Sequence, residues 1–166
     1  MSQQHYVSRN GFLALRKQLK DLSDDLSAST RAMGLSAGID NDLRENPEFL
    51  QLRTKVTYEL PSKIATLQEV LCGCALIENI PDVQANRFEA VLPGAEVTVE
   101  SENGNIRVFS ILGFGEGDPA RVIISYLSPV AAVLLDQPVG QEVSLPYQGE
   151  ATPYVIIRIR RSDFLR

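Results

Sequence analysis

Residues 9–34 read RNGFLALRKQLKDLSDDLSASTRAMG, and this stretch decides the architecture of the first half of the chain. Its apolar residues recur at alternating steps of three and four, with polar residues between them. They are Phe12, Leu15, Leu19, Leu22 and Leu26, followed one heptad later by Met33. This spacing predicts an amphipathic helix with the seam of a coiled coil, and Ser8 stands at its N-cap position.

A second apolar seam follows residues 33–42, MGLSAGIDND, which interrupt the pattern with residues suited to a turn. Two matching seams predict an antiparallel coiled-coil hairpin over about residues 9–77, on the order of 40 Å long at 1.5 Å per residue. Pro61 should bend the second helix, because it removes one backbone hydrogen bond while the seam resumes beyond it. The second seam comprises Phe49, Leu52, Val56, Leu60, Ile64, Leu67, Leu71 and Cys74.

Beyond Pro81 the apolar period shortens to that of β-strands. Residues 95–114 contain two alternating runs around Asn103-Gly104, a dipeptide that favours a tight turn, and so predict a β-hairpin. Further strands are expected at 121–126, 142–147 and 154–161, as parts of a compact antiparallel sheet. The segment SPVAAVLLD, residues 128–136, predicts one short helix with Ser128 at its N-cap and Pro129 at its first position.

Composition limits the classes of function. The 166 residues are 44% hydrophobic, enough for a core, and they contain no apolar run that could span a bilayer and no signal-peptide pattern. We therefore expect a soluble, cytoplasmic protein without a membrane partner. The net charge of −5 argues against binding duplex nucleic acid through its phosphates and favours a protein partner.

The residues that could do chemistry are few. Cys72 and Cys74 are spaced poorly for a disulfide and supply only half a zinc site, so reduced thiols packed on a helix are expected. The one histidine, His5, lies near an N-terminus expected to be loose, which disfavours a His-based triad or metal cluster. Any chemistry must therefore rest on carboxylates.

Residues 40–49, DNDLRENPEF, carry those carboxylates at the tip of the predicted hairpin. Asp42 and Glu45 are three apart and would project from nearly the same side of a helical turn, where they could share Mg²⁺ through oxygen ligands. Alone, two acids cannot hold Mg²⁺ tightly. Alternatively, Asp42, Glu45 and Glu48 are only partners for the dipole of the second helix.

Two segments resemble the GreA/GreB transcript-cleavage family. NDLRENPEF is similar to the family's tip motif G-D-L-(K/R/S)-E-N-A-E-(Y/F). ISYLSPVAAVLLDQPVGQEVSL resembles its segment I-S-x-x-S-P-(L/I/V)-x-x-x-L-(L/I)-G-x-x-x-G-(D/E)-x-(V/I), which belongs to an FKBP-like domain. The resemblance covers about residues 6 to 160. It implies an α+β fold, with an antiparallel coiled-coil hairpin in residues 1–80 and an FKBP-like antiparallel sheet domain with one short helix in residues 81–166, joined by a linker around 78–84.

The resemblance also implies a function. Such factors are bacterial proteins that bind RNA polymerase at its secondary channel and insert the hairpin toward the active centre. There Asp42 and Glu45 would be the catalytic, metal-organising acids for a second Mg²⁺ shared with the polymerase, which cleaves its own backtracked transcript. The chain would be an accessory factor and not an enzyme, acting as a monomer and meeting nascent RNA, with DNA contact left open.

The resemblance assigns contact roles to four further residues. Arg44 and Arg53 would face RNA or polymerase, although an exposed helical arginine is often only solvated. Ser128 and Pro129 match the docking loop, and their identity as a helix cap explains them equally well.

At several positions the chain departs from the family pattern. Asn41 and Pro47 replace the usual tip glycine and alanine, Gly38 replaces a basic residue, Leu127 replaces a polar residue and Asp136 replaces a glycine. Two alternatives therefore stay open. The chain could be a Gre-like polymerase regulator or inhibitor without cleavage activity, or its hairpin could be a dimerising coiled coil beside a sheet that binds an unrelated protein.

Overall fold

The computed structural model describes residues 4–39, 46–147 and 149–165. The chain forms two compact units. The sheet unit comprises Met1–Phe12 and Cys74–Arg166, and the helical unit comprises Leu13–Gly73. The domain boundary expected between residues 80 and 81 stays a prediction; in this division residues 74–80 lie with the sheet. Within the described ranges, no helix is long and apolar enough to cross a membrane.

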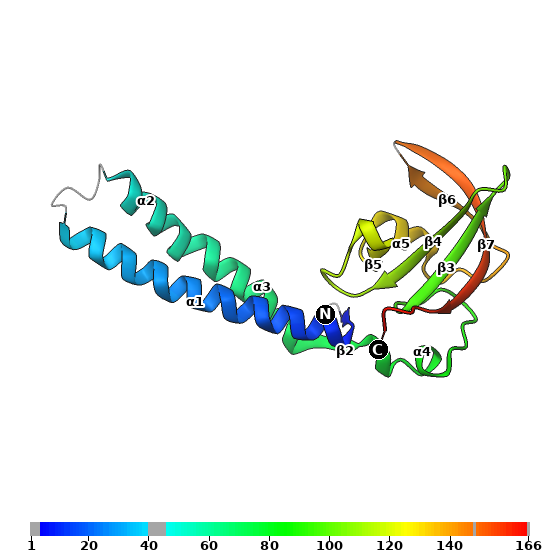
Figure 1. Ribbon diagram of the computed structural model, residues 1–166, viewed down its shortest axis with the longest axis horizontal. Coiled ribbons are helices and arrows are strands. Elements are labelled where there is room, and N and C mark those ends of the chain that lie inside the picture. The colour runs from blue at the N-terminus through cyan, green and yellow to red at the C-terminus, as the bar shows by residue number, and fades with distance from the viewer. Residues whose placement is uncertain (1–3, 40–45, 148, 166) are drawn as a thin grey trace. The chain divides into compact units, whose positions relative to one another are not determined.

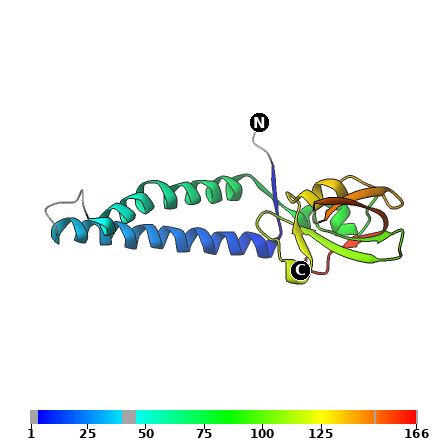
Figure 2. The same cartoon turned by 90° about the horizontal axis from the view of Figure 1, so that it is seen from above.

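The helical unit consists of two helical segments that lie side by side and run in opposite directions (Figures 1 and 2). The first is α1 (Arg9–Ile39), and the second comprises α2 (Pro47–Thr54), the π-helical turn η1 (Lys55–Glu59) and α3 (Leu60–Gly73). Leu15 of α1 is buried, as are Leu60, Leu67 and Val70 of α3. A salt bridge of 2.8 Å between Lys55 Nζ and Asp25 Oδ1 ties the two segments together. Coiled-coil packing in the strict sense stays a prediction.

The first helix is longer than its sequence pattern suggested. A turn was expected to begin in the Gly34 to Gly38 stretch, but α1 continues through this stretch to Ile39, so that expectation was wrong. A glycine inside a helix costs about 1 kcal/mol relative to alanine, yet it keeps its backbone hydrogen bonds and does not end the helix by itself. The remainder of the expected turn, residues 40–42, lies outside the described residues.

Pro61 is accommodated by the wider turn that precedes it. The backbone N–H of Leu60 bonds to the carbonyl of Lys55, five residues back, which makes η1 a π-helical turn. In a regular helix the proline ring would clash with the carbonyl four residues before it. The helical segment continues past Pro61 to Gly73, as the seam predicted.

The sheet unit contains a curled five-stranded sheet in the order β5-β4-β3-β7-β6 (Figure 1). Its strands are β3 (Ala95–Ser101), β4 (Ile106–Leu112), β5 (Ile123–Ser125), β6 (Glu142–Tyr147) and β7 (Glu150–Arg161). The predicted hairpin of β3 and β4 is confirmed, and Gly104 in its turn adopts a φ of 75°. A positive φ suits glycine because it lacks a Cβ.

One strand corrects the expectation of a purely antiparallel sheet. β5 pairs with β4 in parallel, with Ser110 opposite Ile123. The chain between these strands passes through the short 3₁₀ helix η3 (Pro119–Arg121), which brings it back to start β5 in the direction of β4. The fold class is α+β with a mostly antiparallel sheet.

The sheet unit also includes a small parallel pair that the sequence did not reveal. β1 (His5–Val7) pairs with β2 (Cys74–Leu76), so His5 is not in a loose terminus and Cys74 is not helical. After β2 the chain forms η2 (Ile77–Asn79) and α4 (Pro81–Ala85). Ile77, Glu78 and Val83 in this stretch are buried, so the linker expected around residues 78–84 was wrong.

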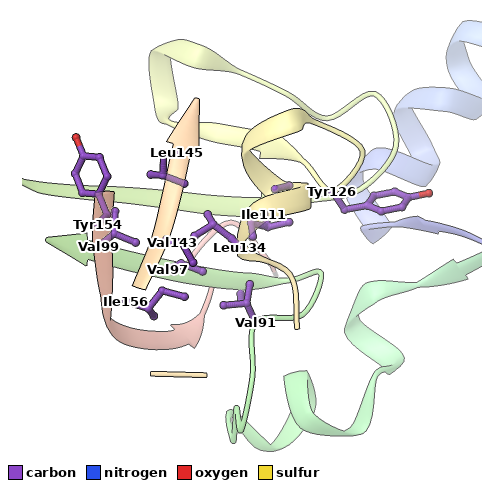
Figure 3. Close-up of a cluster of buried hydrophobic side chains, with 12 residues drawn as sticks. Val91, Val97, Val99, Ile111, Tyr126, Leu134, Val143, Leu145, Tyr154 and Ile156 are labelled. Atoms are coloured by element: carbon purple, nitrogen blue, oxygen red, sulfur yellow. The ribbon is translucent and has the colours of Figure 1, made fainter. Parts of the chain in front are cut away.

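The larger of the two core clusters of the sheet unit lies on one face of the sheet, against α5 (Pro129–Leu134). Figure 3 shows Leu134 of α5 among the side chains of Val97, Val143 and Ile156 from three strands. Alternation along each strand turns these residues to the same face. This packing holds α5 and the residues that precede it in place.

Candidate functional site

The acidic segment singled out in the sequence lies between two described helix ends. α1 ends at Ile39 and α2 begins at Pro47. Asp42, Arg44 and Glu45 fall between these ends and lie outside the described residues. Their roles therefore stay predictions, and so does the alternative that the acids only complement the dipole of α2.

The start of α2 is fixed by a cap that the sequence reading missed. The side-chain oxygen of Asn46 accepts hydrogen bonds from the backbone N–H groups of Glu48 and Phe49, at 3.0 Å and 3.2 Å. Pro47 follows at the first helical position, which explains how a proline can replace the family's alanine. The triplet Asn-Pro-Glu carried this signal, because asparagine is a preferred N-cap and proline is favoured directly after it.

Arg53 lies in the last turn of α2, and its side chain is exposed. The structure therefore presents the Arg53 guanidinium to solvent, where a partner could reach it. Its nucleic-acid or polymerase contact stays a prediction.

Ser128 and Pro129 form the predicted start of α5. The Ser128 hydroxyl accepts a hydrogen bond of 3.1 Å from the backbone N–H of Ala131, and Pro129 occupies the first helical position. Pro129 is exposed, and the preceding Leu127 is 48% exposed. Leu127 and Pro129 are therefore exposed at the start of α5, a helix that is itself packed against the core of the sheet unit.

Asp136 shows how the chain adapts to a departure from the family pattern. It adopts a φ of 65°, the left-handed conformation that a glycine would take without strain. Its backbone N–H donates a 2.9 Å hydrogen bond to the Val91 carbonyl. Aspartate tolerates this region better than most residues, so the backbone course after α5 does not require glycine.

Among residues 4–39, 46–147 and 149–165, no group of three or more histidine, cysteine, aspartate or glutamate side chains could hold a metal. Cys72 and Cys74 form no disulfide. The carboxylates of Asp42 and Glu45 are oxygen donors of the kind that Mg²⁺ prefers, and two of them leave most positions of its octahedral shell for other ligands. This donor set fits a shared ion.

Comparison with known proteins identifies the family. The family described as "Transcription elongation factor, GreA/GreB, C-term" matches residues 85–161. The solved structure of the transcription factor Gfh1 aligns with a TM-score of 0.46 at 18% identity, covering 96% of this chain and 99% of that chain. Transcription elongation factor GreB of Yersinia pestis is 31% identical over 166 residues, covering 99% of this chain and 93% of that protein. Transcription elongation factor GreA of Desulfovibrio desulfuricans is 30% identical over 154 residues, covering 92% and 91%. The chain belongs to the GreA/GreB family of transcription elongation factors.

Proposed function

We propose that this chain is a bacterial elongation factor that binds RNA polymerase at the secondary channel and stimulates cleavage of backtracked transcript. The observation that carries the proposal is the position of the segment DLREN, residues 42–46, between the end of α1 and the capped start of α2, in a chain 31% identical to a GreB over 99% of its length. The factor acts as a cytoplasmic monomer. It supplies no complete active site and works through the polymerase.

The proposal includes an architecture for each of the two units. The helical unit is an antiparallel coiled-coil hairpin, and the sheet unit is an FKBP-like docking domain. The 31 residues of α1 correspond to a rod of about 46 Å. Such a rod can carry a small group of side chains into a channel too narrow for a globular domain. The Asp25–Lys55 salt bridge and the buried leucines support the pairing of its two arms.

In this mechanism the chain's residues divide the work. The carboxylates of Asp42 and Glu45 would hold Mg²⁺ together with polymerase carboxylates, and Asn46 fixes the start of the helix that follows them. The ion supplies Lewis-acid chemistry for phosphodiester hydrolysis. Arg44 and Arg53 contact RNA or polymerase, and the loop of Ser128 and Pro129 docks the sheet unit. A fold of this kind does not by itself confer prolyl isomerase activity.

The decisive test replaces both tip acids while keeping their shape. Asp42→Asn with Glu45→Gln should leave polymerase binding intact and reduce transcript cleavage by artificially backtracked polymerase at least about a hundredfold, because both substitutions weaken the hold on one ion. Raised Mg²⁺ should partly rescue each single variant. Glu48→Gln is the matched control, because Glu48 lies exposed in the first turn of α2. If the double variant cleaves like wild type, the tip acids are only dipole partners.

The docking role is tested separately. Ser128→Arg with Pro129→Glu places bulky charges on the proposed loop and should abolish polymerase binding. Ser128→Ala is the control, because it removes only the hydroxyl that caps α5 and costs about 1 kcal/mol. Undiminished capture of polymerase by the charged variant would place the anchor elsewhere on the chain.

A second candidate function is a regulator that enters the channel without promoting cleavage. The observation that favours it is Gly38 in the last turn of α1, where the family pattern has a basic residue. Wild-type protein that binds polymerase and never stimulates cleavage, at any Mg²⁺ concentration, would establish this function instead.

A further inference from the structure

The N-terminus of α1 is capped by two carboxylates from distant parts of the chain. The first turn of α1 contains no acidic residue of its own. Glu116, 108 residues away, accepts a 2.9 Å hydrogen bond from the Ser8 backbone N–H through Oε2, and its Oε1 accepts one from the Ser8 hydroxyl. Glu78 lies 69 residues from Arg9 in the sequence, and its two carboxylate oxygens accept hydrogen bonds of 2.9 Å and 3.1 Å from the Arg9 backbone N–H. Carboxylates suit this position because unpaired N–H groups and the helix dipole make it positive.

The Glu116 carboxylate occupies a close-fitting cradle. The Gly113 backbone N–H donates a further hydrogen bond of 2.8 Å to its Oε2. A Cβ atom added to Gly11 would lie 2.4 Å from the Glu116 carboxyl carbon, and one added to Gly113 would lie 2.3 Å from Oε2. The approach of the Glu116 side chain therefore favours glycine at both positions, and at Gly113 the nearby backbone of Tyr6 and Val7 excludes a Cβ as well. We call Glu78, Glu116 and the Ser8 and Arg9 groups that they bind the clamp. It is sheltered from solvent, since Ser8 is 1% exposed and Glu78 is 5% exposed.

The core of the sheet unit does not depend on this clamp. The buried members of its two apolar clusters come from the segments between Ile77 and Leu165. Tyr6 of β1 packs against both clusters, and none of the described members comes from α1. Loss of the clamp should therefore leave the sheet unit folded. What the clamp does hold is α1, a continuous helix whose residues 9–12 belong to the sheet unit while its later residues belong to the helical unit.

We infer that Glu78 and Glu116 are positioning residues for the cleavage reaction. They act through Ser8 and Arg9 to hold the first turn of α1 firmly, so that the helix delivers the acids beyond Ile39 reproducibly once the sheet unit is docked. This inference rests on the proposed function. Catalytic groups must be placed to within a fraction of an ångström, and a misplacement of 1 Å can cost on the order of a hundredfold in rate.

The test separates binding from the reaction. Glu116→Ala and Glu78→Ala should leave the affinity for polymerase within about twofold and reduce the cleavage rate at saturating factor by on the order of 10- to 100-fold. Glu116→Gln and Glu78→Gln keep an acceptor oxygen and should restore most of that rate. Glu102→Ala, a change at an exposed position in the β3–β4 turn, is the matched control and should behave as wild type.

Hydrogen exchange supplies a readout that does not require polymerase. The amide of Gly11 bonds to the Ser8 hydroxyl at 2.9 Å, and the amide of Phe12 bonds to the Ser8 carbonyl at 2.8 Å. Both should exchange faster in the alanine variants. Ser8→Ala provides a second test in case an alanine variant at 78 or 116 does not fold. It leaves both glutamates in the chain, removes the hydroxyl that bonds to Glu116 and to the Gly11 N–H, and should also reduce cleavage.

The outcomes are distinct. Faster exchange with wild-type cleavage overturns the inference, and so does a parallel loss of binding and cleavage, which would mark a merely structural role. Failure of the wild-type protein to stimulate cleavage would overturn the proposed function and the role of the clamp in it, while the exchange rates would still report whether the two carboxylates anchor α1.

Discussion

The Asn46 cap offers a direct test of how the residues after the acidic segment are held. Asn46→Ala removes the oxygen that accepts from the Glu48 and Phe49 N–H groups. The helix it caps, α2, has eight residues and none of them is buried, so packing compensates little for the loss. Pro47 has no N–H, which leaves these two amides as the donors that the cap satisfies.

The expected magnitude follows from these bonds. Replacing an asparagine N-cap by alanine costs about 1 kcal/mol of helix stability, which corresponds to about a fivefold change in an equilibrium constant. The amides of Glu48 and Phe49 should therefore lose protection from hydrogen exchange by about fivefold. Cleavage of backtracked transcript should fall by a similar factor, because the first turn of α2 frays next to Glu45, while binding to polymerase should not change.

Two controls make this result specific. Asn46→Asp keeps an acceptor and adds a charge that the helix N-terminus favours, so it should retain both protection and cleavage. Asn79→Ala removes an exposed asparagine of the sheet unit and should affect neither. Unchanged exchange at Glu48 and Phe49 in the Asn46→Ala protein would refute the cap and the reasoning built on it.

Two further predictions concern stability. Val122 adopts a φ of 56°, strained for a β-branched residue, so Val122→Asn should raise the free energy of unfolding by about 1 kcal/mol, measured by calorimetry, and a lower melting temperature would contradict the strain. Hydrogen bonds from Lys55 and Ser29 hold the pKa of Asp25 below its ordinary value of 3.8. The contribution of the Asp25–Lys55 pair to the free energy of unfolding is therefore present above that pH, and it is lost as the pH falls through the lower pKa of the folded state. Lys55→Gln should therefore reduce the melting temperature more at about pH 6 than at about pH 2. If the reduction is the same at both pH values, the pair does not stabilise the protein through charge.

Local sequence patterns predicted the elements whose causes are local. Ser8, Pro129 and the Asn103-Gly104 turn were identified correctly, because a cap, a first-turn proline and a tight turn are each decided within four residues. The π-helical turn also left a signal. In the second seam, Leu52, Val56, Leu60 and Ile64 follow one another at three successive steps of four, where a strict heptad would alternate steps of four and three.

Features that depend on distant residues could not be predicted in this way. The parallel direction of β5 is set by the path of the preceding loop, and the three residues Ile-Ile-Ser that form this strand do not reveal its direction. Glu116 lies in an unremarkable run of glycines and acids, and only the fold brings it to Ser8. The buried Glu78 was mistaken for part of a linker, because glutamate, asparagine and proline nearby are typical of exposed connections.

The parallel pairing of β1 with β2 has a consequence for how such chains can be rebuilt. Because the strand before α1 and the strand after α3 are direct neighbours, the whole of Leu13–Gly73 is an insertion between two adjacent strands of one unit. Insertions with neighbouring ends can be lengthened, shortened or exchanged while the host retains its own connectivity. The helical pair can thus be exchanged as one insert, and grafts that join a foreign hairpin at residues 12 and 74 should conserve the host. A graft that replaces the chain from residue 13 through residue 80 would instead remove β2 and leave β1 without its partner.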